Sequence, residues 1–116
     1  MNEPMHPQPS PHGVKDVDVG ALEEFPLGAV REIIADGRVL AVARTEEGLF
    51  ALDGLCPHQG GPLGKGKLEG CVVICPWHQF AFDMKSGFCT SSRGLTQPRY
   101  EVLAQEGRVI VQFPDD

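Results

Sequence analysis

The sequence predicts an all-β domain in which an antiparallel β base, built from both ends of the chain, carries an inserted subdomain with two loops at its tip. Short apolar runs alternate with turn signals from residue 14 onward. Glycine and proline interrupt every helical pattern except ALEEF at residues 21–25. A glycine-rich stretch separates the two strand-rich halves, and it places the inserted subdomain at about residues 54–89.

The first half of the base is expected to contain four strands. VKDVDV at residues 14–19 alternates apolar and polar side chains, which indicates a strand with one buried face. LGAVREIIA at 27–35 and GRVLAVAR at 37–44 flank Asp36-Gly37, a pair that supplies the positive φ angles of a tight hairpin turn. GLFALD at 48–53 reads as the next strand.

The second half of the base and the insertion follow the same pattern. RYEVLAQ at 99–105 and RVIVQF at 108–113 flank Glu106-Gly107 and predict a second hairpin. Within the insertion, CVVIC at 71–75 is a compact strand between the two loops. FAFD followed by the turn MKSG, residues 80–87, predicts the start of a further hairpin.

Length and charge limit the function classes. The 116 residues suit one small domain, which we place at residues 14–116, and the proline-rich residues 1–13 are expected to be a disordered tail. A net charge of −6 argues against nucleic acid as a partner, because nucleic-acid binding needs clustered Lys and Arg. The sequence shows neither a long apolar span nor a secretion signal, so we expect a cytoplasmic protein without a membrane contact.

Cysteine and histidine occur together twice in the inserted stretch, as Cys56-x-His58 and Cys75-x-x-His78. These side chains are ligands for zinc and iron. In structural zinc fingers, like ligands are usually grouped, whereas here each loop offers one cysteine and one histidine. A tetrahedral zinc site remains the chemical alternative to an iron–sulfur cluster.

The two boxes CPHQGGPL and CPWHQFAFD resemble the cluster-binding boxes of Rieske ferredoxins and related Rieske-type subunits. The resemblance implies a Rieske-type antiparallel β sandwich or barrel and one [2Fe-2S] cluster. Cys56 and Cys75 would then ligate one iron, and His58 and His78 the other. With two thiolates and neutral imidazoles the oxidised cluster carries no net charge, and one electron gives it a charge of −1.

Residues around the boxes fit such a cluster. Gly60 and Gly61 would let backbone N–H groups approach the sulfides, whereas Gly64 is expected to lie in an ordinary turn. Trp77 is the best candidate to shield the cluster. Many relatives have glycine after the second histidine, where this chain has Gln79.

The loops also bear on the reduction potential. High-potential relatives carry an additional cysteine in each loop and hydroxyl side chains after the second box. The corresponding positions here are Gly61 and Trp77 for the cysteines, and Phe80 and Phe82 for the hydroxyls. We therefore expect a midpoint potential near the bottom of the Rieske range, on the order of −150 mV.

The implied function is that of a one-electron carrier between a flavin-dependent reductase and a terminal oxygenase. The alternative is a small Rieske-type subunit that works with the large subunit of an NADH-dependent nitrite reductase or a similar oxidoreductase. The sequence offers no nucleophile–base pair or phosphate loop, so we expect no catalytic site of its own. Cys71 shares strand parity with Val73 and is expected to be a small buried side chain; a Cys71–Cys89 disulfide is the other possibility.

Overall fold

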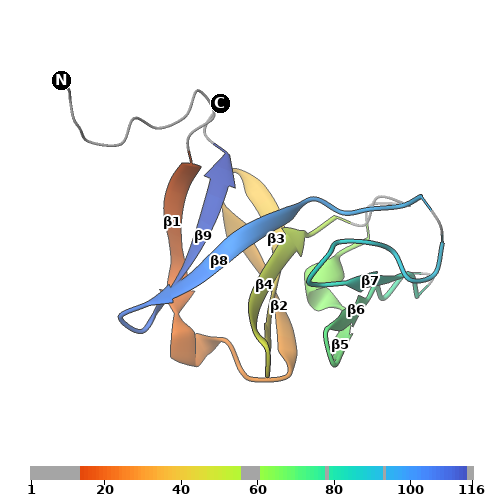
Figure 1. Cartoon of the computed structure of the whole chain (residues 1–116), viewed down its shortest axis with the longest axis horizontal. Coiled ribbons are helices and arrows are strands. Elements are labelled where there is room, and N and C mark those ends of the chain that lie inside the picture. Colours follow the sequence, from red (N-terminus) through yellow and green to blue (C-terminus); the bar gives the residue numbers. More distant parts are fainter. Residues whose placement is uncertain (1–13, 56–60, 78, 93, 115–116) are drawn as a thin grey trace.

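The structure is a computed structural model that describes residues 14–55, 61–77, 79–92 and 94–114. These residues form two antiparallel sheets (Figure 1). The larger sheet has the strand order β1 (Val14–Ala21), β9 (Arg108–Pro114), β8 (Arg99–Gln105), β4 (Gly48–Asp53), β3 (Arg38–Thr45) and β2 (Ala29–Ala35). The smaller sheet has the order β5 (Lys67–Glu69), β6 (Val72–Ile74) and β7 (Ala81–Asp83). Two short 3₁₀ turns, η1 (Leu22–Glu24) and η2 (Leu63–Lys65), complete the described elements.

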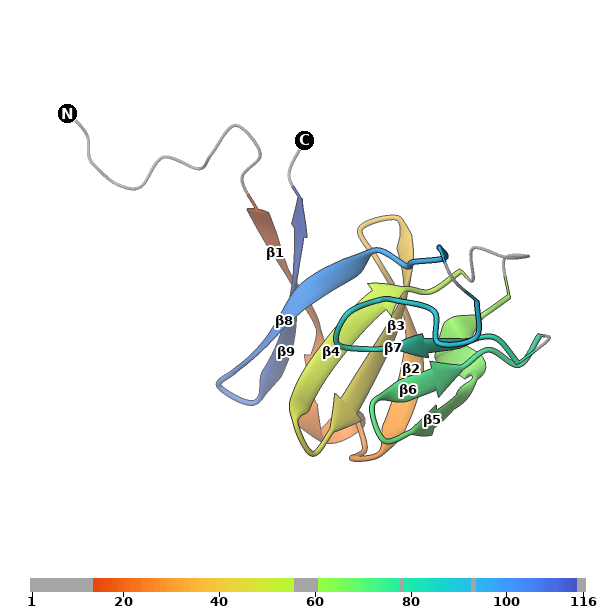
Figure 2. The same cartoon turned by 45° about the vertical axis from the view of Figure 1, so that its right-hand side comes forward.

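The larger sheet is the predicted base, and it is built from both ends of the chain. It curls until its two edge strands, β1 and β2, contact each other. The smaller sheet lies beside this base, as both views show (Figure 2). The all-β architecture with an inserted subdomain is therefore confirmed.

Both predicted hairpins form around the expected turn residues. Asp36 and Gly37 have φ values of 54° and 73°, and Glu106 and Gly107 have values of 52° and 79°. Two successive positive φ angles are the signature of the type I′ turn, whose twist matches that of antiparallel strands. The β2–β3 and β8–β9 registers follow directly from these turns.

Strand β3 is buried on both faces and joins the base to the insertion. Leu40 and Val42 point into the core of the base, together with Phe25, Val109, Val111 and Phe113. Ala41 and Ala43 point the other way, where they pack with Leu63, Val73, Phe82 and Met84 of the insertion. Because successive side chains of a strand face opposite sides, the Leu-Ala-Val-Ala run places small residues where the second layer approaches.

The insertion differs from the sequence expectation in three places. Lys67–Glu69 forms β5 and Leu63–Lys65 forms η2, and neither element was expected. After β7 the chain returns as predicted, but it pairs only through the isolated Phe82–Cys89 bridge and flanking backbone hydrogen bonds. The three-residue strands of this sheet are too short to show a clear alternation of apolar and polar side chains.

Gly64 does not lie in an ordinary turn, which corrects the sequence expectation. It is buried in η2, against β2. A Cβ added at Gly64 would lie 2.5 Å from Glu32 Cα, so the glycine is needed for the close approach of η2 to the base. Among the described residues, none of the helices is long and apolar enough to cross a membrane. The predicted N-terminal tail, residues 1–13, lies outside the described residues.

Candidate metal centre

Cys75 is the predicted ligand that the structure describes, and it sits where β6 ends. Its side chain is fully buried. The Cys75 N–H donates to the Phe80 carbonyl at 2.8 Å, which closes the second loop at its base. The Trp77 backbone N–H donates to Cys75 Sγ at 3.3 Å. A hydrogen bond to sulfur favours the thiolate, which is the form of cysteine that ligates metals.

Gly61 of the first loop lies directly against Cys75 of the second. A Cβ added at Gly61 would come within 2.7 Å of Cys75 Sγ and within 3.0 Å of Trp77 Cγ. This contact places the Gly61 backbone against the sulfur of a predicted ligand, whereas the predicted approach of its N–H group to the cluster sulfides stays a prediction. The described end of the first loop therefore lies against the second loop.

The other three predicted ligands, Cys56, His58 and His78, lie outside the described residues, as does Gly60. Within the part of the chain that the structure describes, three or more metal-binding side chains do not gather at any point. The structure therefore describes one of the four predicted ligands, and the complete ligand set stays a prediction.

The aromatic side chains of the second box divide between surface and core. Trp77 is 50% exposed, and its side chain lies against Gly61. Phe80 is partly buried and packs on the core that joins the two sheets, and Phe82 is fully buried in that core. Trp77 thus combines contact with the loops and an exposed face.

Gln79 has a φ of 60°, which is the left-handed region of the backbone. An L-residue is disfavoured there, whereas glycine adopts this conformation without a Cβ penalty. This geometry gives a physical reason for the glycine that many relatives have after the second histidine. The departure at Gln79 is therefore a local backbone strain.

A cavity of about 330 Å³ borders Cys75 on the side of β5. Its polar lining includes Lys65 and Lys67, whose ammonium groups lie 3.9 Å from Glu32 and 3.6 Å from Glu69. The lysine charges are therefore compensated locally. Because Glu32 and Glu69 lie beside these lysines, the cavity next to the Cys75 thiol is not strongly basic.

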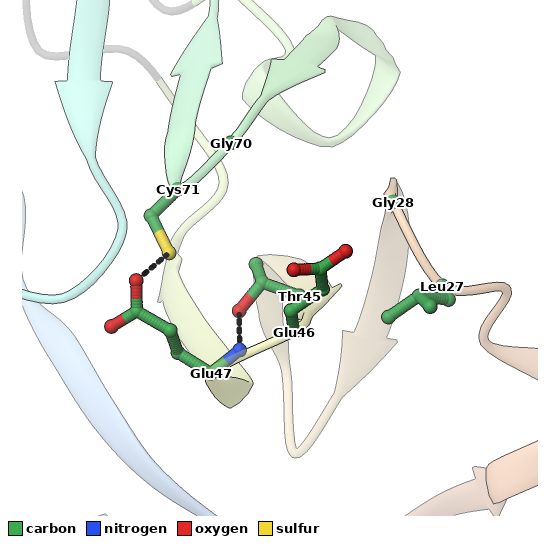
Figure 3. A pocket seen from close by; sticks show the side chains of 7 residues that line it. All are labelled: Leu27, Gly28, Thr45, Glu46, Glu47, Gly70 and Cys71. Carbon is green, nitrogen blue, oxygen red and sulfur yellow. Dashed lines mark hydrogen bonds between the residues drawn. The ribbon is translucent and has the colours of Figure 1, made fainter.

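A second hollow, of about 360 Å³, lies at the opposite end of the small sheet from Cys75 and involves Cys71 (Figure 3). Cys71 is half-buried in the turn before β6, and its thiol points toward Glu47, with 3.9 Å between Sγ and Oε2. The expectation that Cys71 is buried like Val73 is wrong, because β6 begins only at Val72. Lys85 donates to Glu47 at 2.6 Å, and this hydrogen bond raises the pKa of Lys85. Cys71 and Cys89 are free thiols, so the alternative disulfide is not formed.

Two polar side chains beside the loops were missed by sequence reasoning. Ser91 Oγ accepts the Ala81 N–H at 3.1 Å and so supports the strand that follows the second loop. Gln97 is buried and donates to carbonyls of the segment that enters the first loop. Neither residue has a motif of its own, and only the position of Ser91 just after the second box could have suggested its contact.

The fold and this site fit one class of protein: small β proteins in which two loops meet at a buried cysteine. Cys75 fits a sulfur-ligated cluster, since it is buried, accepts a backbone hydrogen bond and faces a glycine whose missing Cβ leaves room. The comparisons make this class specific. The family model for the Rieske [2Fe-2S] domain matches residues 15–111, and the chain belongs to this family. Its cofactor is one Rieske-type [2Fe-2S] cluster.

Similar proteins include electron-transfer components and parts of larger chains. The chain is 38% identical over 73 residues to the ferredoxin component of the naphthalene 1,2-dioxygenase system of Pseudomonas aeruginosa, which covers 63% of this chain and 70% of that one. It is 34% identical over 109 residues to apoptosis-inducing factor 3 of Homo sapiens, which covers 92% of this chain but only 18% of that relative. The chain thus spans less than a fifth of that protein's length.

Solved structures share the fold closely. A chain from the complex of reduced oxygenase and oxidized ferredoxin in carbazole 1,9a-dioxygenase matches with a TM-score of 0.77 and 32% identity, covering 83% of this chain and 91% of that one. The putative NADH-dependent nitrite reductase small subunit of Mycobacterium tuberculosis matches with a TM-score of 0.82 and 21% identity, covering 89% and 98%. The second likeness shows the fold alone. The ferredoxin relatives support an electron-carrier role.

Proposed function

We propose that this protein is a one-electron carrier that receives electrons from a flavin-dependent reductase and passes them to a terminal oxygenase. In this proposal Cys56 and Cys75 ligate one iron, and His58 and His78 ligate the other. When bound, the cluster accepts and releases a single electron. The observation that carries the proposal is the fully buried Cys75, with the Trp77 N–H on its sulfur and Gly61 pressed against it.

The chain's own residues account for how such a centre is held. The Trp77 N–H donates to the Cys75 sulfur and stabilises negative charge there. Gly61 lies against this sulfur and against the Trp77 side chain, and Cys75 is fully buried. Phe80 and Phe82 stand at the positions where high-potential relatives carry hydroxyl donors, and the low reduction potential that we propose rests on them.

An exposed apolar surface lies beside the site. Trp77 is 50% exposed and Leu55, whose segment pairs with Pro62 next to Gly61, is 49% exposed. Tryptophan is enriched among the residues that dominate binding energy at protein interfaces. We propose that the oxygenase contacts these two side chains, because a partner seated there would be close to Cys75.

The ferredoxin relatives support the oxygenase assignment. One of them is 38% identical to this chain, and a similar solved structure comes from a complex of an oxygenase with its ferredoxin. The proposal also keeps three expectations from the sequence. The protein is cytoplasmic, residues 14–116 form one domain, and residues 1–13 form a tail. A zinc module, the chemical alternative, would be colourless and would show no midpoint in a redox titration.

Redox titration and reconstitution test this function. We expect one-electron behaviour with a midpoint on the order of −150 mV. We also expect monomeric protein to be reduced by an added flavin-dependent reductase and reoxidised by a terminal oxygenase. A clearly positive midpoint would contradict the assignment of Phe80 and Phe82. Permanent association with a sirohaem subunit would favour the nitrite reductase alternative instead.

A further inference from the structure

Gln97 is one of two buried polar side chains among the described residues; the other is Thr45. The Gln97 side chain is only 4% exposed. Its Nε2 donates to the Asp53 carbonyl at 2.7 Å and to the Leu55 carbonyl at 2.5 Å. Both partners are carbonyl oxygens, so only the NH₂ end of the amide can face them.

The segment that Gln97 contacts is the stem from which the first loop begins. Asp53 is the last residue of β4, and Leu55 is joined directly to Cys56 in the chain. Gly54 N–H donates to Val39 O at 2.7 Å, and Gly54 O accepts the Leu63 N–H at 2.9 Å. Gln97 thus adds the side-chain donors to a stem that backbone hydrogen bonds already tie to the base.

Gln97 itself is held firmly. Its N–H donates to Gly87 O at 2.7 Å, and a Cβ added at Gly87 would lie 2.4 Å from Gln97 O. The next residue, Pro98, accepts the Asp53 N–H at 2.8 Å. The chain after the second loop is therefore hydrogen-bonded to the stem of the first loop. The Gln97 amide group makes the side-chain hydrogen bonds of this connection.

We propose that Gln97 is a positioning residue for the cluster. By holding the Asp53 and Leu55 carbonyls, it fixes the direction in which the chain enters Cys56. This inference rests on the proposed function, because Cys56 is a ligand only in the proposed ligand set. A cluster bound across two loops is retained only as long as both stems stay in place.

The role depends on hydrogen-bond donation and not on the shape of the side chain. A glutamate at this position has the same size and shape but cannot donate to both carbonyl oxygens: its ionised form only accepts hydrogen bonds and would repel them, and its protonated form donates a single one. A leucine would fill a similar volume and leave both carbonyls buried without these donors. The two variants therefore separate donation from packing.

The experiment compares wild type, Gln97→Glu, Gln97→Leu and the control Thr45→Val, all purified with cluster. Thr45 Oγ1 donates to Gly48 O and accepts the Glu47 N–H, at the opposite end of β4 from Asp53. The control therefore also removes buried hydrogen bonds, but far from the loops. Cluster loss is followed as bleaching of the visible absorbance in excess chelator, and linewidths are measured by electron paramagnetic resonance of the reduced proteins.

We expect both Gln97 variants to lose the cluster about tenfold faster than wild type. Their resonance lines should broaden, because a loosely held stem gives a spread of cluster geometries. The rate of cluster loss in Thr45→Val should stay within about twofold of the wild-type rate, even if its melting temperature falls as much as in the Gln97 variants. Wild-type rates and linewidths in Gln97→Glu would overturn the inference. So would equal cluster loss in Thr45→Val, which would mean that general destabilisation is the cause. If the wild type itself held no iron, the proposed function would fail before Gln97 is tested.

Discussion

Gly61→Ala is the substitution that most directly probes the contact between the two loops. The added Cβ would lie 2.7 Å from Cys75 Sγ, whereas a comfortable contact between heavy atoms is about 3.5–4.0 Å. The sulfur or the first loop must therefore move by about 1 Å. The φ of Gly61 is outside the left-handed region, so the backbone accepts alanine and the penalty is steric.

Overpacking of this kind costs about 1–3 kcal/mol, and the surfaces forced apart here are the two loops. We expect Gly61→Ala to hold less iron per chain than wild type as purified, and to lose the remainder faster. Iron content as purified measures the first effect, and bleaching of the visible absorbance over time measures the second. Thermal unfolding of the holoprotein measures the loss of stability. The melting temperature should fall by about 4–8 °C for each kcal/mol lost.

Gly70→Ala is a suitable control. Gly70 has a φ of 62°, and a Cβ added there meets nothing within 4 Å. This variant should therefore suffer about 1 kcal/mol of backbone strain without touching the loops. Full iron content in Gly61→Ala, or an equal iron loss in Gly70→Ala, would refute the close approach of the two loops as the reason for this glycine.

Three further predictions follow from single contacts. Cys75→Ala should abolish the visible absorbance, whereas Cys71→Ala should keep it, because Cys71 faces Glu47 at the other end of the small sheet; equal iron in both variants would contradict the site. Gln79→Gly should raise the free energy of unfolding by about 1 kcal/mol, measured by chemical denaturation, because it removes an L-residue from a φ of 60°; an unchanged or lower value would argue against strain at this position. The Arg108 hydrogen bond lowers the pKa of Asp18, so this pair stabilises the fold above about pH 4. The contribution is lost as the pH falls further. The free energy of unfolding of Arg108→Gln should therefore decrease less in acid than that of wild type.

The parts of the fold that could be predicted from sequence have strong local causes. Asp36-Gly37 and Glu106-Gly107 specify their turns through positive φ angles, so both hairpins were expected with nearly correct ends. The Leu-Ala-Val-Ala run of β3 is too apolar on both faces to be a half-exposed strand. The structure shows why, since one face packs inside the base and the other against the insertion.

The elements that were missed depend on tertiary contacts. β5 (Lys67–Glu69) is polar and three residues long, and only its pairing with β6 makes it a strand. Gly64 looked like a turn residue because nothing in its neighbourhood reveals that Glu32, far away in the chain, lies against it. Gln97 carries no motif, and its importance appears only when its two carbonyl partners are seen.

The site was predicted from spacing and resemblance, and the structure describes one of its four predicted ligands, Cys75. Cys75 is buried and lies against Gly61, and its role as a ligand stays a prediction. Trp77 was expected to shield the site and is half exposed over it, so the same side chain is also available to a partner. Spacing alone could not distinguish these two roles, because exposure depends on how the loops pack.

The most direct test of the central claim is electron paramagnetic resonance of the dithionite-reduced wild-type protein. Ligation by two thiolates and two imidazoles predicts one unpaired spin per chain, with a mean g value below that of a cluster held by four thiolates. A spectrum typical of four-thiolate ligation, or a silent sample that contains zinc in place of iron, would contradict the account.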